Sequence, residues 1–188
     1  MKAVHCVENG ARLDDSCPEP RIPEGEVLLR TRMAGICRTD LELTKGYMGF
    51  QGILGHEFVA EVAEPAGEWE KGARVVGEIN AGCGTCPLCR QGLERHCPHR
   101  TTLGIFNRDG CMAEYLTLPA RNLFRAPDGI PDNYLVFTEP LAAVLEIFEQ
   151  IQVRPMDRIC VLGDGKLGLL AALVVGRRHE GESLLVGH

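Results

Sequence analysis

The sequence lacks several features that would assign it to particular classes of protein. No stretch approaches the roughly 18 uninterrupted apolar residues of a membrane-spanning helix, and the first residues, Met1 to Cys6, lack the apolar core of a secretory signal. The sequence has no basic run, its net charge is −6, and aromatic residues make up only 5% of it. We therefore expect a cytoplasmic protein that binds neither nucleic acid nor an anionic membrane.

The residues that are present are typical of an ordinary globular protein. Hydrophobic residues make up 45% of the 188 residues and charged residues 24%, which is enough apolar material for a sizeable core. This length predicts one domain or a little more. Nine cysteines are many for a chain without a secretory signal. An odd number of cysteines argues against a disulfide framework and favours metal ligands together with free thiols.

The pattern of apolar residues changes along the chain, and its first part predicts β structure. Up to about residue 130, short apolar segments rich in β-branched residues alternate with Gly and Pro. Strands are predicted near 27–32, 57–63, 73–79, 112–118 and 122–126.

The second part of the chain predicts alternating helices and strands. From Thr138, apolar residues recur at helical spacing, which predicts an amphipathic helix ending near Arg154-Pro155. An apolar strand at 158–162, a glycine-rich turn, a helix and a second strand at 183–186 follow. The boundary between the two parts is expected near 138–150.

A cysteine-rich segment, 81–100, interrupts the β region. It is rich in Gly and Pro, shows no apolar periodicity, and contains Cys83, Cys86, Cys89 and Cys97. Four thiolates satisfy tetrahedral Zn²⁺ and leave no open position, so this spacing predicts a structural zinc site. Binding the ion offsets the ordering entropy of a segment that has no core of its own.

Alternatives to a structural zinc site held by the four cysteines are less favoured. The four cysteines could be free thiols clustered by chance or a reactive redox cluster, although a reactive thiol also needs an electropositive setting. A nucleic-acid-binding zinc ribbon is disfavoured by the acidic balance and the scarce aromatics. The histidines next to the last cysteine, His96 and His99, could be ligands, but we expect both at the surface.

Three further candidate ligands, Cys37, His56 and Glu139, are scattered along the sequence. Taken singly, Cys37 is more often a buried hydrophobe and His56 a core or turn histidine. Glu139 is a typical first-turn acid of a helix. Spacing alone does not bring the three residues together.

Several motifs in order carry a family resemblance. They are Cys37-Arg38-Thr39-Asp40, Gly55-His56-Glu57, the four cysteines, Gly110-Cys111-Met112-Ala113-Glu114-Tyr115, Glu139-Pro140-Leu141-Ala142, and the glycines Gly163, Gly165 and Gly168. In this combination the sequence resembles the zinc-dependent medium-chain dehydrogenase/reductase superfamily, which includes alcohol, sorbitol and threonine dehydrogenases. The resemblance covers essentially the whole chain.

The resemblance implies a fold class and a division into domains. The fold class is mixed β and α/β: a GroES-like β-barrel catalytic domain over residues 1–140, with the structural zinc lobe at 81–100, followed by the beginning of a Rossmann doubly wound parallel sheet over 141–188. Members of the family are longer, so the Rossmann domain is expected to be partial here. A catalytic zinc is expected in the cleft between the domains, giving two zinc ions per chain.

The resemblance also implies roles at the catalytic zinc. Cys37 and His56 are the implied ligands, with Glu139 as the third, as in the sorbitol-dehydrogenase-like branch; the alcohol-dehydrogenase branch uses a later cysteine. Glu57 is an alternative ligand or lies just outside the ligand shell. Asp40 orients His56 by accepting its other ring N–H.

The implied reaction interconverts an alcohol, with a secondary alcohol or polyol favoured, and its carbonyl by hydride transfer to NAD or NADP. Zinc lowers the pKa of the alcohol, and Thr39 carries its proton away. Some relatives extend this relay with a histidine a few residues further on. Here that stretch is Leu41-Glu42-Leu43, without a histidine, so Glu42 or water is left as the outer acceptor. The alternative function is a non-catalytic, zinc-stapled GroES-like module or an inactive truncated relative. Candidates for the wall of a substrate pocket are Leu43, Tyr47, Phe50 and Phe106. As single apolar positions, they are more typical of the core.

The glycine-rich turn predicts a dinucleotide site. Gly163 permits the tight turn, Gly165 lets a pyrophosphate approach the backbone, and Gly168 permits close helix–strand packing. The resemblance adds Arg38 as a partner of the pyrophosphate. The end of the second strand, near Gly187-His188, has no acid for a ribose, which faintly favours NADP. A homodimer or homotetramer acting on a small-molecule alcohol is implied.

Overall fold

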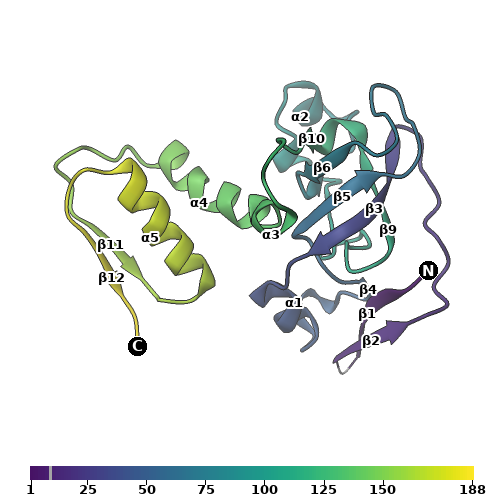
Figure 1. The fold of residues 1–188 in the computed structure, drawn as a ribbon, viewed down its shortest axis with the longest axis horizontal. Coiled ribbons are helices and arrows are strands. Elements are labelled where there is room, and N and C mark those ends of the chain that lie inside the picture. Colours follow the sequence, from purple (N-terminus) through teal and green to yellow (C-terminus); the bar gives the residue numbers. More distant parts are fainter. Residues whose placement is uncertain (9) are drawn as a thin grey trace. The chain divides into compact units, whose positions relative to one another are not determined.

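The computed structural model describes residues 1–8 and 10–188, which divide into two compact units, Met1–Phe137 and Thr138–His188 (Figure 1). The first unit is built mainly from antiparallel strands, and the second from two helices and a parallel strand pair. Among the described residues, no helix combines the length and the apolar character needed to cross a bilayer.

Three antiparallel sheets organise the first unit. A five-stranded sheet has the order β10-β6-β5-β3-β9, a three-stranded sheet the order β2-β1-β4, and β7 pairs with β8. The strands are β1 (Ala3–Val7), β2 (Gly10–Asp14), β3 (Glu26–Ala34), β4 (Gly52–Ile53), β5 (Phe58–Val62), β6 (Arg74–Gly77), β7 (Asn80–Ala81), β8 (Thr101–Thr102), β9 (Tyr115–Pro119) and β10 (Leu123–Arg125).

Short helices connect these strands. They are α1 (Arg38–Leu43), η1 (Tyr47–Gly49), α2 (Pro87–Arg90), η2 (Glu94–His96), η3 (Ala120–Asn122) and α3 (Asp132–Leu135). The five predicted strands correspond to β3, β5, β6, β9 and β10, so these predictions are confirmed. Strands β1, β2, β4, β7 and β8 were not predicted. The last three have two residues each, which is too short to show an alternation.

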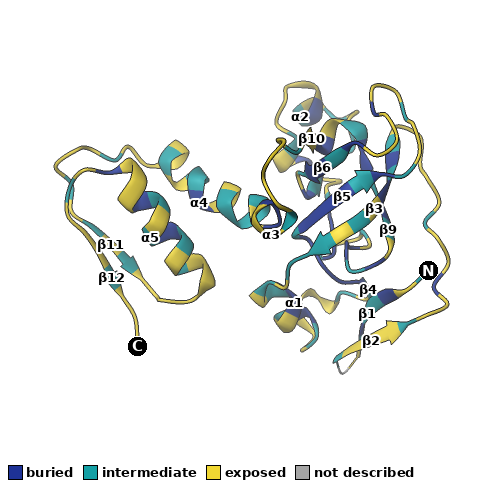
Figure 2. Cartoon of the chain, in the orientation of Figure 1, coloured by how far each residue is buried: buried dark blue, intermediate teal, exposed yellow. Residues whose placement is uncertain are grey.

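Strand β3 is an interior strand of the five-stranded sheet, where it pairs with β5 on one side and the edge strand β9 on the other. Val27 and Leu29 on β3 are fully buried and alternate with the exposed Arg30. The largest cluster of buried apolar side chains lies on this sheet and on the segments packed against it (Figure 2). Each buried Val, Leu or Phe contributes about 1.5–3 kcal/mol to folding, so this cluster stabilises the scaffold that holds the candidate sites.

The second unit has the strand–turn–helix–strand order expected of its sequence. Its elements are α4 (Thr138–Gln150), β11 (Ile159–Leu162), α5 (Lys166–Arg178) and β12 (Ser183–Val186). Strands β11 and β12 are parallel, and α5 packs against α4 and β12. Helix α4 begins at Thr138, as predicted, and ends a few residues before the predicted stop at Arg154-Pro155.

Candidate functional site

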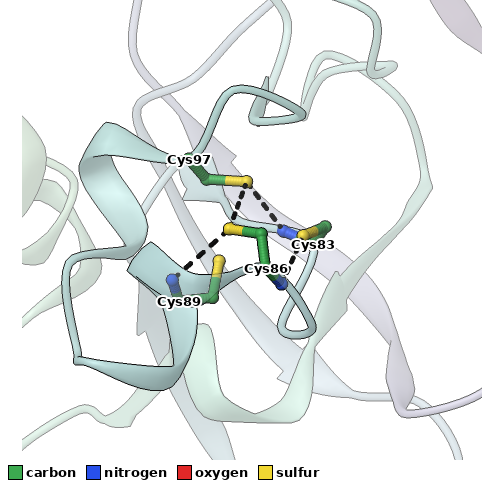
Figure 3. A group of neighbouring side chains, drawn as sticks. All are labelled: Cys83, Cys86, Cys89 and Cys97. Atoms are coloured by element: carbon green, nitrogen blue, oxygen red, sulfur yellow. Dashed lines mark hydrogen bonds between the residues drawn. The ribbon is translucent and has the colours of Figure 1, made fainter.

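Four cysteine side chains converge in the segment between β7 and β8 (Figure 3). The sulfurs of Cys83, Cys86, Cys89 and Cys97 all lie within 4.8 Å of one another. Cys86 precedes α2, and Pro87 at the first helical position starts the turn that brings Cys89 back toward it. Cys89 and Cys97 are buried. The predicted grouping of the four cysteines is therefore present in the structure.

Backbone N–H groups point at these sulfurs. Cys83 N donates to Cys97 Sγ at 3.4 Å, Cys86 N to Cys83 Sγ at 3.4 Å, and His99 N to Cys97 Sγ at 3.3 Å. Hydrogen bonds from Thr85 and Cys86 lower the pKa of the Cys83 thiol to about 5. These bonds stabilise the thiolate, which is the form that ligates a metal.

The thiolates cannot all form without a compensating charge. Burial and the neighbouring thiols raise the pKa of the Cys89 thiol to about 12, in contrast to Cys83. A divalent cation at the centre of the group removes this conflict, and four sulfur donors at this spacing fit tetrahedral Zn²⁺. The two nearby histidines, His96 and His99, are exposed, as predicted.

A side chain of the neighbouring η3 helix attaches the cysteine-rich segment to the rest of the unit. Arg121 Nη2 donates to the Gly82 carbonyl at 2.6 Å, and Arg121 Nε pairs with Glu94 Oε1 at 3.0 Å. Gly82 is also tightly packed, because a Cβ there would come within 2.9 Å of Cys89 Sγ. The segment is therefore fixed by polar contacts at its edge.

A second group of metal-type donors contains Cys37, His56 and Glu57, whose candidate ligand atoms lie within 4.8 Å of one another. Cys37 is the residue that precedes α1, and His56 and Glu57 precede β5. Gly55, immediately before His56, has a φ of 98° and no room for a side chain, since a Cβ would come within 2.8 Å of Cys111 Sγ. The glycine therefore permits the backbone turn that brings His56 to Cys37.

Asp40 lies behind His56 and links it to Cys37. Asp40 Oδ1 is 3.3 Å from His56 Nδ1, and Asp40 Oδ2 accepts a hydrogen bond from Cys37 N at 2.8 Å. His56 and Asp40 are 3% and 2% exposed. Burial opposes protonation of His56, but Asp40 and then Cys37 outweigh it and raise the pKa of His56 to about 9. Because Nδ1 faces Asp40, Nε2 is the nitrogen available to an ion.

The position of Glu57 depends on Gly35, a residue that the sequence motifs do not single out. A Cβ at Gly35 would collide with the Glu57 side chain, coming within 2.9 Å of its Cβ. Gly35 N also donates to the Glu57 carbonyl at 2.8 Å. The only signal in the sequence is a glycine two residues before Cys37, and a glycine at such a place is equally typical of an ordinary turn.

The remaining predicted residues of the α1 region are distributed around this group. Thr39 Oγ1 lies 3.7 Å from Cys37 Sγ. Arg38, the predicted pyrophosphate partner, is exposed and pairs with Glu42 at 2.8 Å. Glu42 also pairs with Lys45 at 3.1 Å, so both of its neighbours here are cationic.

Two of the predicted pocket-wall residues line a cavity of about 390 Å³ in the first unit. These are Phe50 and Phe106, and the cavity also includes Met48 and Asp109. Leu43 is buried in the core, as expected of a single apolar position. Tyr47 is exposed.

The glycine-rich turn lies in the second unit between β11 and α5. Gly163 has a φ of 107°, and a Cβ at Gly168 would collide with the Gly163 carbonyl, coming within 2.9 Å of its carbon. At Gly165, which precedes α5, a Cβ would meet nothing within 4 Å. The geometry is that of a turn whose outer side is open to a phosphate at a helix N-terminus. Glu139 also belongs to this unit, in the first turn of α4.

Comparison with known proteins adds a family to this geometry. Residues 23–128 match the alcohol dehydrogenase GroES-like domain. An L-threonine 3-dehydrogenase from Salmonella gallinarum is 34% identical over 193 residues, which cover 95% of this chain and 56% of the relative. The chain thus spans about half the length of the curated relatives it matches.

Two solved structures share the fold. An alcohol dehydrogenase from E. coli in complex with NADH matches with a TM-score of 0.87 and 26% identity, covering 98% of this chain and 56% of that one. A zinc-binding dehydrogenase from Sinorhizobium meliloti bound to NADP matches with a TM-score of 0.84 and 29% identity, covering 98% and 55%. The predicted fold class is confirmed as mixed β and α/β, with a GroES-like β domain followed by the beginning of a Rossmann sheet. The chain belongs to the zinc-dependent medium-chain dehydrogenase/reductase superfamily.

Proposed function

We propose that this chain carries the zinc and dinucleotide sites of a dehydrogenase that interconverts a secondary alcohol or polyol and its carbonyl. The observation that carries the proposal is the buried Asp40–His56 pair beside Cys37. A histidine held by a carboxylate next to a thiol is a typical arrangement for a metal ligand. The four-cysteine group has no open position, so a reacting oxygen needs this second site.

The donor types at this second site fit zinc. Cys37 supplies sulfur, His56 nitrogen and Glu57 a carboxylate oxygen. Glu139 is the third ligand that we propose for the complete protein, with Glu57 as the alternative or as a neighbour of the ligand shell. A bound zinc ion supplies Lewis-acid chemistry, which lowers the pKa of an alcohol in its open position.

Side chains of this chain then transfer the proton of the alcohol. Thr39 is the hydroxyl that we propose accepts the alcohol proton and passes it on, which its position near Cys37 supports. Asp40 keeps the His56 ring in one orientation during this transfer. Because Glu42 is paired with Arg38 and Lys45, water is the better candidate for the outer acceptor.

The second unit is the proposed dinucleotide site. Gly163, Gly165 and Gly168 admit the pyrophosphate at the N-terminus of α5, and Arg38 is the proposed additional cation. NADH in one similar structure and NADP in the other support a nicotinamide cofactor.

The structure offers one argument on the choice of cofactor. A side chain at Gly187 would collide with the carboxyl group of Asp164, so Asp164 supplies a carboxylate at the end of β12 that the local sequence lacks. A carboxylate at this position favours the free ribose of NAD over the phosphorylated ribose of NADP. We therefore propose NAD, in place of the faint sequence preference for NADP.

The substrate class follows from the relatives. L-threonine carries a secondary hydroxyl at the position named in L-threonine 3-dehydrogenase, which supports a secondary alcohol as substrate. A cytoplasmic location and a homodimer or homotetramer belong to the same proposal.

The test is oxidation of secondary alcohols by the zinc-loaded chain with NAD⁺ or NADP⁺, followed by the absorbance of the reduced nicotinamide. We expect Cys37→Ser to abolish turnover and to lower the zinc content by about one equivalent. Thr39→Val should keep the zinc and lower turnover by about 10²–10⁴-fold. Cys160→Ser, at an exposed thiol, is the matched control. If Cys37→Ser leaves the zinc content unchanged, the alternative of a non-catalytic, zinc-stapled module is the better description.

A further inference from the structure

A third group of metal-type donors lies on the three-stranded sheet of the first unit. His5 on β1 pairs with Arg12 on β2, and Ala3 pairs with Asp14. Side chains two positions apart on a strand share a face, and paired residues of neighbouring strands point to the same side. His5 and Asp14 therefore lie diagonally on one face of the sheet.

The loop after β2 adds a thiol to this face. Cys17 is buried against Ala3 and Ile53, and its carbonyl accepts a hydrogen bond from Met1 N at 2.6 Å, which fixes the loop. Ligand atoms of His5, Asp14 and Cys17 lie within 4.8 Å of one another. The spacing of these residues in the sequence does not indicate the group, because it depends on the register of β1 against β2.

This group is separate from the site around His56. Cys6 lies next to His5 in β1 and points to the opposite face, where its thiol donates to the Leu43 carbonyl of α1 at 3.4 Å. The group shares no residue with the other two donor groups. An ion bound here is therefore additional to those that the proposed function requires, and the inference does not rest on that function.

Two atoms of the group have unused bonding capacity. His5 Nε2 is enclosed and has no hydrogen-bond partner among the described residues. Both hydrogen bonds from Ser16 to Asp14 go to Oδ1, at 2.8 and 3.0 Å. The other carboxylate oxygen, Oδ2, is therefore the one available to bind an ion. A buried polar nitrogen without a partner indicates a missing water or ion.

The surroundings of Cys17 argue against a reactive thiol. Burial and then the charges of Asp14 and Asp109 raise the pKa of the Cys17 thiol, while the Met1 amino group acts in the opposite direction. Arg12 is the cation nearest Asp14 on its own strand, and His5 also lies beside Asp14. A nucleophilic cysteine needs a lowered pKa and access to solvent, and Cys17 has neither.

We propose that His5, Asp14 and Cys17 form a third zinc-type metal site, with Nε2, Oδ2 and Sγ as donors and water in the fourth position. Nitrogen, oxygen and sulfur donors suit Zn²⁺, and ion–donor distances of about 2.0–2.3 Å hold such donors up to about 4 Å apart. The donor atoms of the group lie within 4.8 Å of one another, so they need to approach by at most about 1 Å to hold an ion. With three protein ligands, this site binds metal more weakly than the four-cysteine group.

The test is a titration with Co²⁺ of the chain loaded with only two equivalents of zinc, one for the four-cysteine group and one for the group around His56. Co²⁺ bound to a thiolate is detected by a sulfur-to-metal charge-transfer absorption. We expect one further equivalent of Co²⁺ with this absorption. Cys17→Ala should remove the absorption while keeping the buried apolar contacts of Cys17. Asp14→Asn should weaken Co²⁺ binding at least tenfold, and His5→Gln should do the same.

Matched controls separate this site from the others and from misfolding. Asp15→Asn changes the neighbouring exposed acid and should bind Co²⁺ like the unmodified chain. Cys37→Ser should keep the absorption, because Cys37 belongs to a different group. Circular dichroism identifies any variant that fails to fold. If Cys17→Ala fails to fold, Asp14→Asn, at a partly exposed position, provides the decisive result. An absorption that persists in Cys17→Ala, or equal Co²⁺ affinity in Asp14→Asn and Asp15→Asn, would overturn the proposal.

Discussion

The four-cysteine group and the group around His56 gather metal-type donors by opposite routes. The four cysteines lie within one short segment, with backbone N–H groups pointing at their sulfurs and little apolar core around them. Cys37 and His56 come from separate segments, and a buried carboxylate fixes the histidine. We therefore expect the four-cysteine segment to depend on a bound ion for its folding, and the group around His56 to depend on the packing of the surrounding residues.

The largest effect of a substitution is expected at the four-cysteine group. Cys89→Ser removes a buried thiol of this group, and we expect loss of about one zinc ion and local unfolding between β7 and β8. Structural zinc binding contributes about 10–16 kcal/mol in small zinc-binding peptides, which exceeds what the edge contacts of this segment supply. Hydrogen exchange should show lost protection over residues 83–97 and retained protection in β3 and β5.

Cys160→Ser, which changes an exposed thiol of the second unit, is the control for this experiment. Retained protection over residues 83–97 in Cys89→Ser would mean that the segment folds without its metal, and the contrast between the two groups would fail.

An intermediate effect is expected at Asp40. Asp40→Asn should weaken metal binding by about 10–100-fold at pH 9, because the carboxylate no longer orients His56. Below pH 9 the proton on His56 competes with the metal, so the affinity of the unmodified chain should fall about tenfold per pH unit from His56 alone. In Asp40→Asn the pKa of His56 is no longer raised by the carboxylate. The metal affinities of the variant and of the unmodified chain should therefore converge as the pH falls toward 6.5. Competition with a chelator at several pH values measures this.

We expect a corresponding pH dependence in the free energy of unfolding of the metal-free chain. The pKa of His56 is raised from 6.5 to about 9, so the stabilising His56–Asp40 pair is fully present below pH 6.5 and is lost as the pH rises through 9. Urea unfolding of the metal-free protein should show this loss, and Asp40→Asn should not. Glu42→Gln, an acid two residues away on α1, is the control. A constant ratio of affinities across this pH range would contradict the role given to Asp40.

The two groups also differ in how far the sequence predicts them. The four cysteines from Cys83 to Cys97 are close in sequence, so spacing alone predicts that they lie together, as they do. The contact of Asp40 with His56 depends on the packing of α1 against the segment before β5, and only the family resemblance indicates it. The room that Gly35 leaves for Glu57 is a matter of shape that no spacing rule contains.

Register and domain arrangement limit prediction in the same way. The group of His5, Asp14 and Cys17 exists because β1 and β2 pair in one register, and a slip by one residue would turn Asp14 to the other face. The strands and helices with strong periodicity were predictable, because burial of one face repeats along them. Glu139 as a ligand stays a prediction, since it lies in the second unit.

The smallest effect is expected at Arg121, and it separates the contribution of the metal from that of the edge contacts. Arg121→Ala removes the hydrogen bond to the Gly82 carbonyl and the half-exposed pair with Glu94. With zinc bound we expect a loss of about 1 kcal/mol in the free energy of unfolding, and Arg90→Ala, at an exposed arginine of α2, should cost less. After chelation of the zinc the segment is already unfolded, so Arg121→Ala should cost nothing further. A larger cost in the metal-free protein than in the zinc-bound protein would show that Arg121, and not the ion, holds the segment in place.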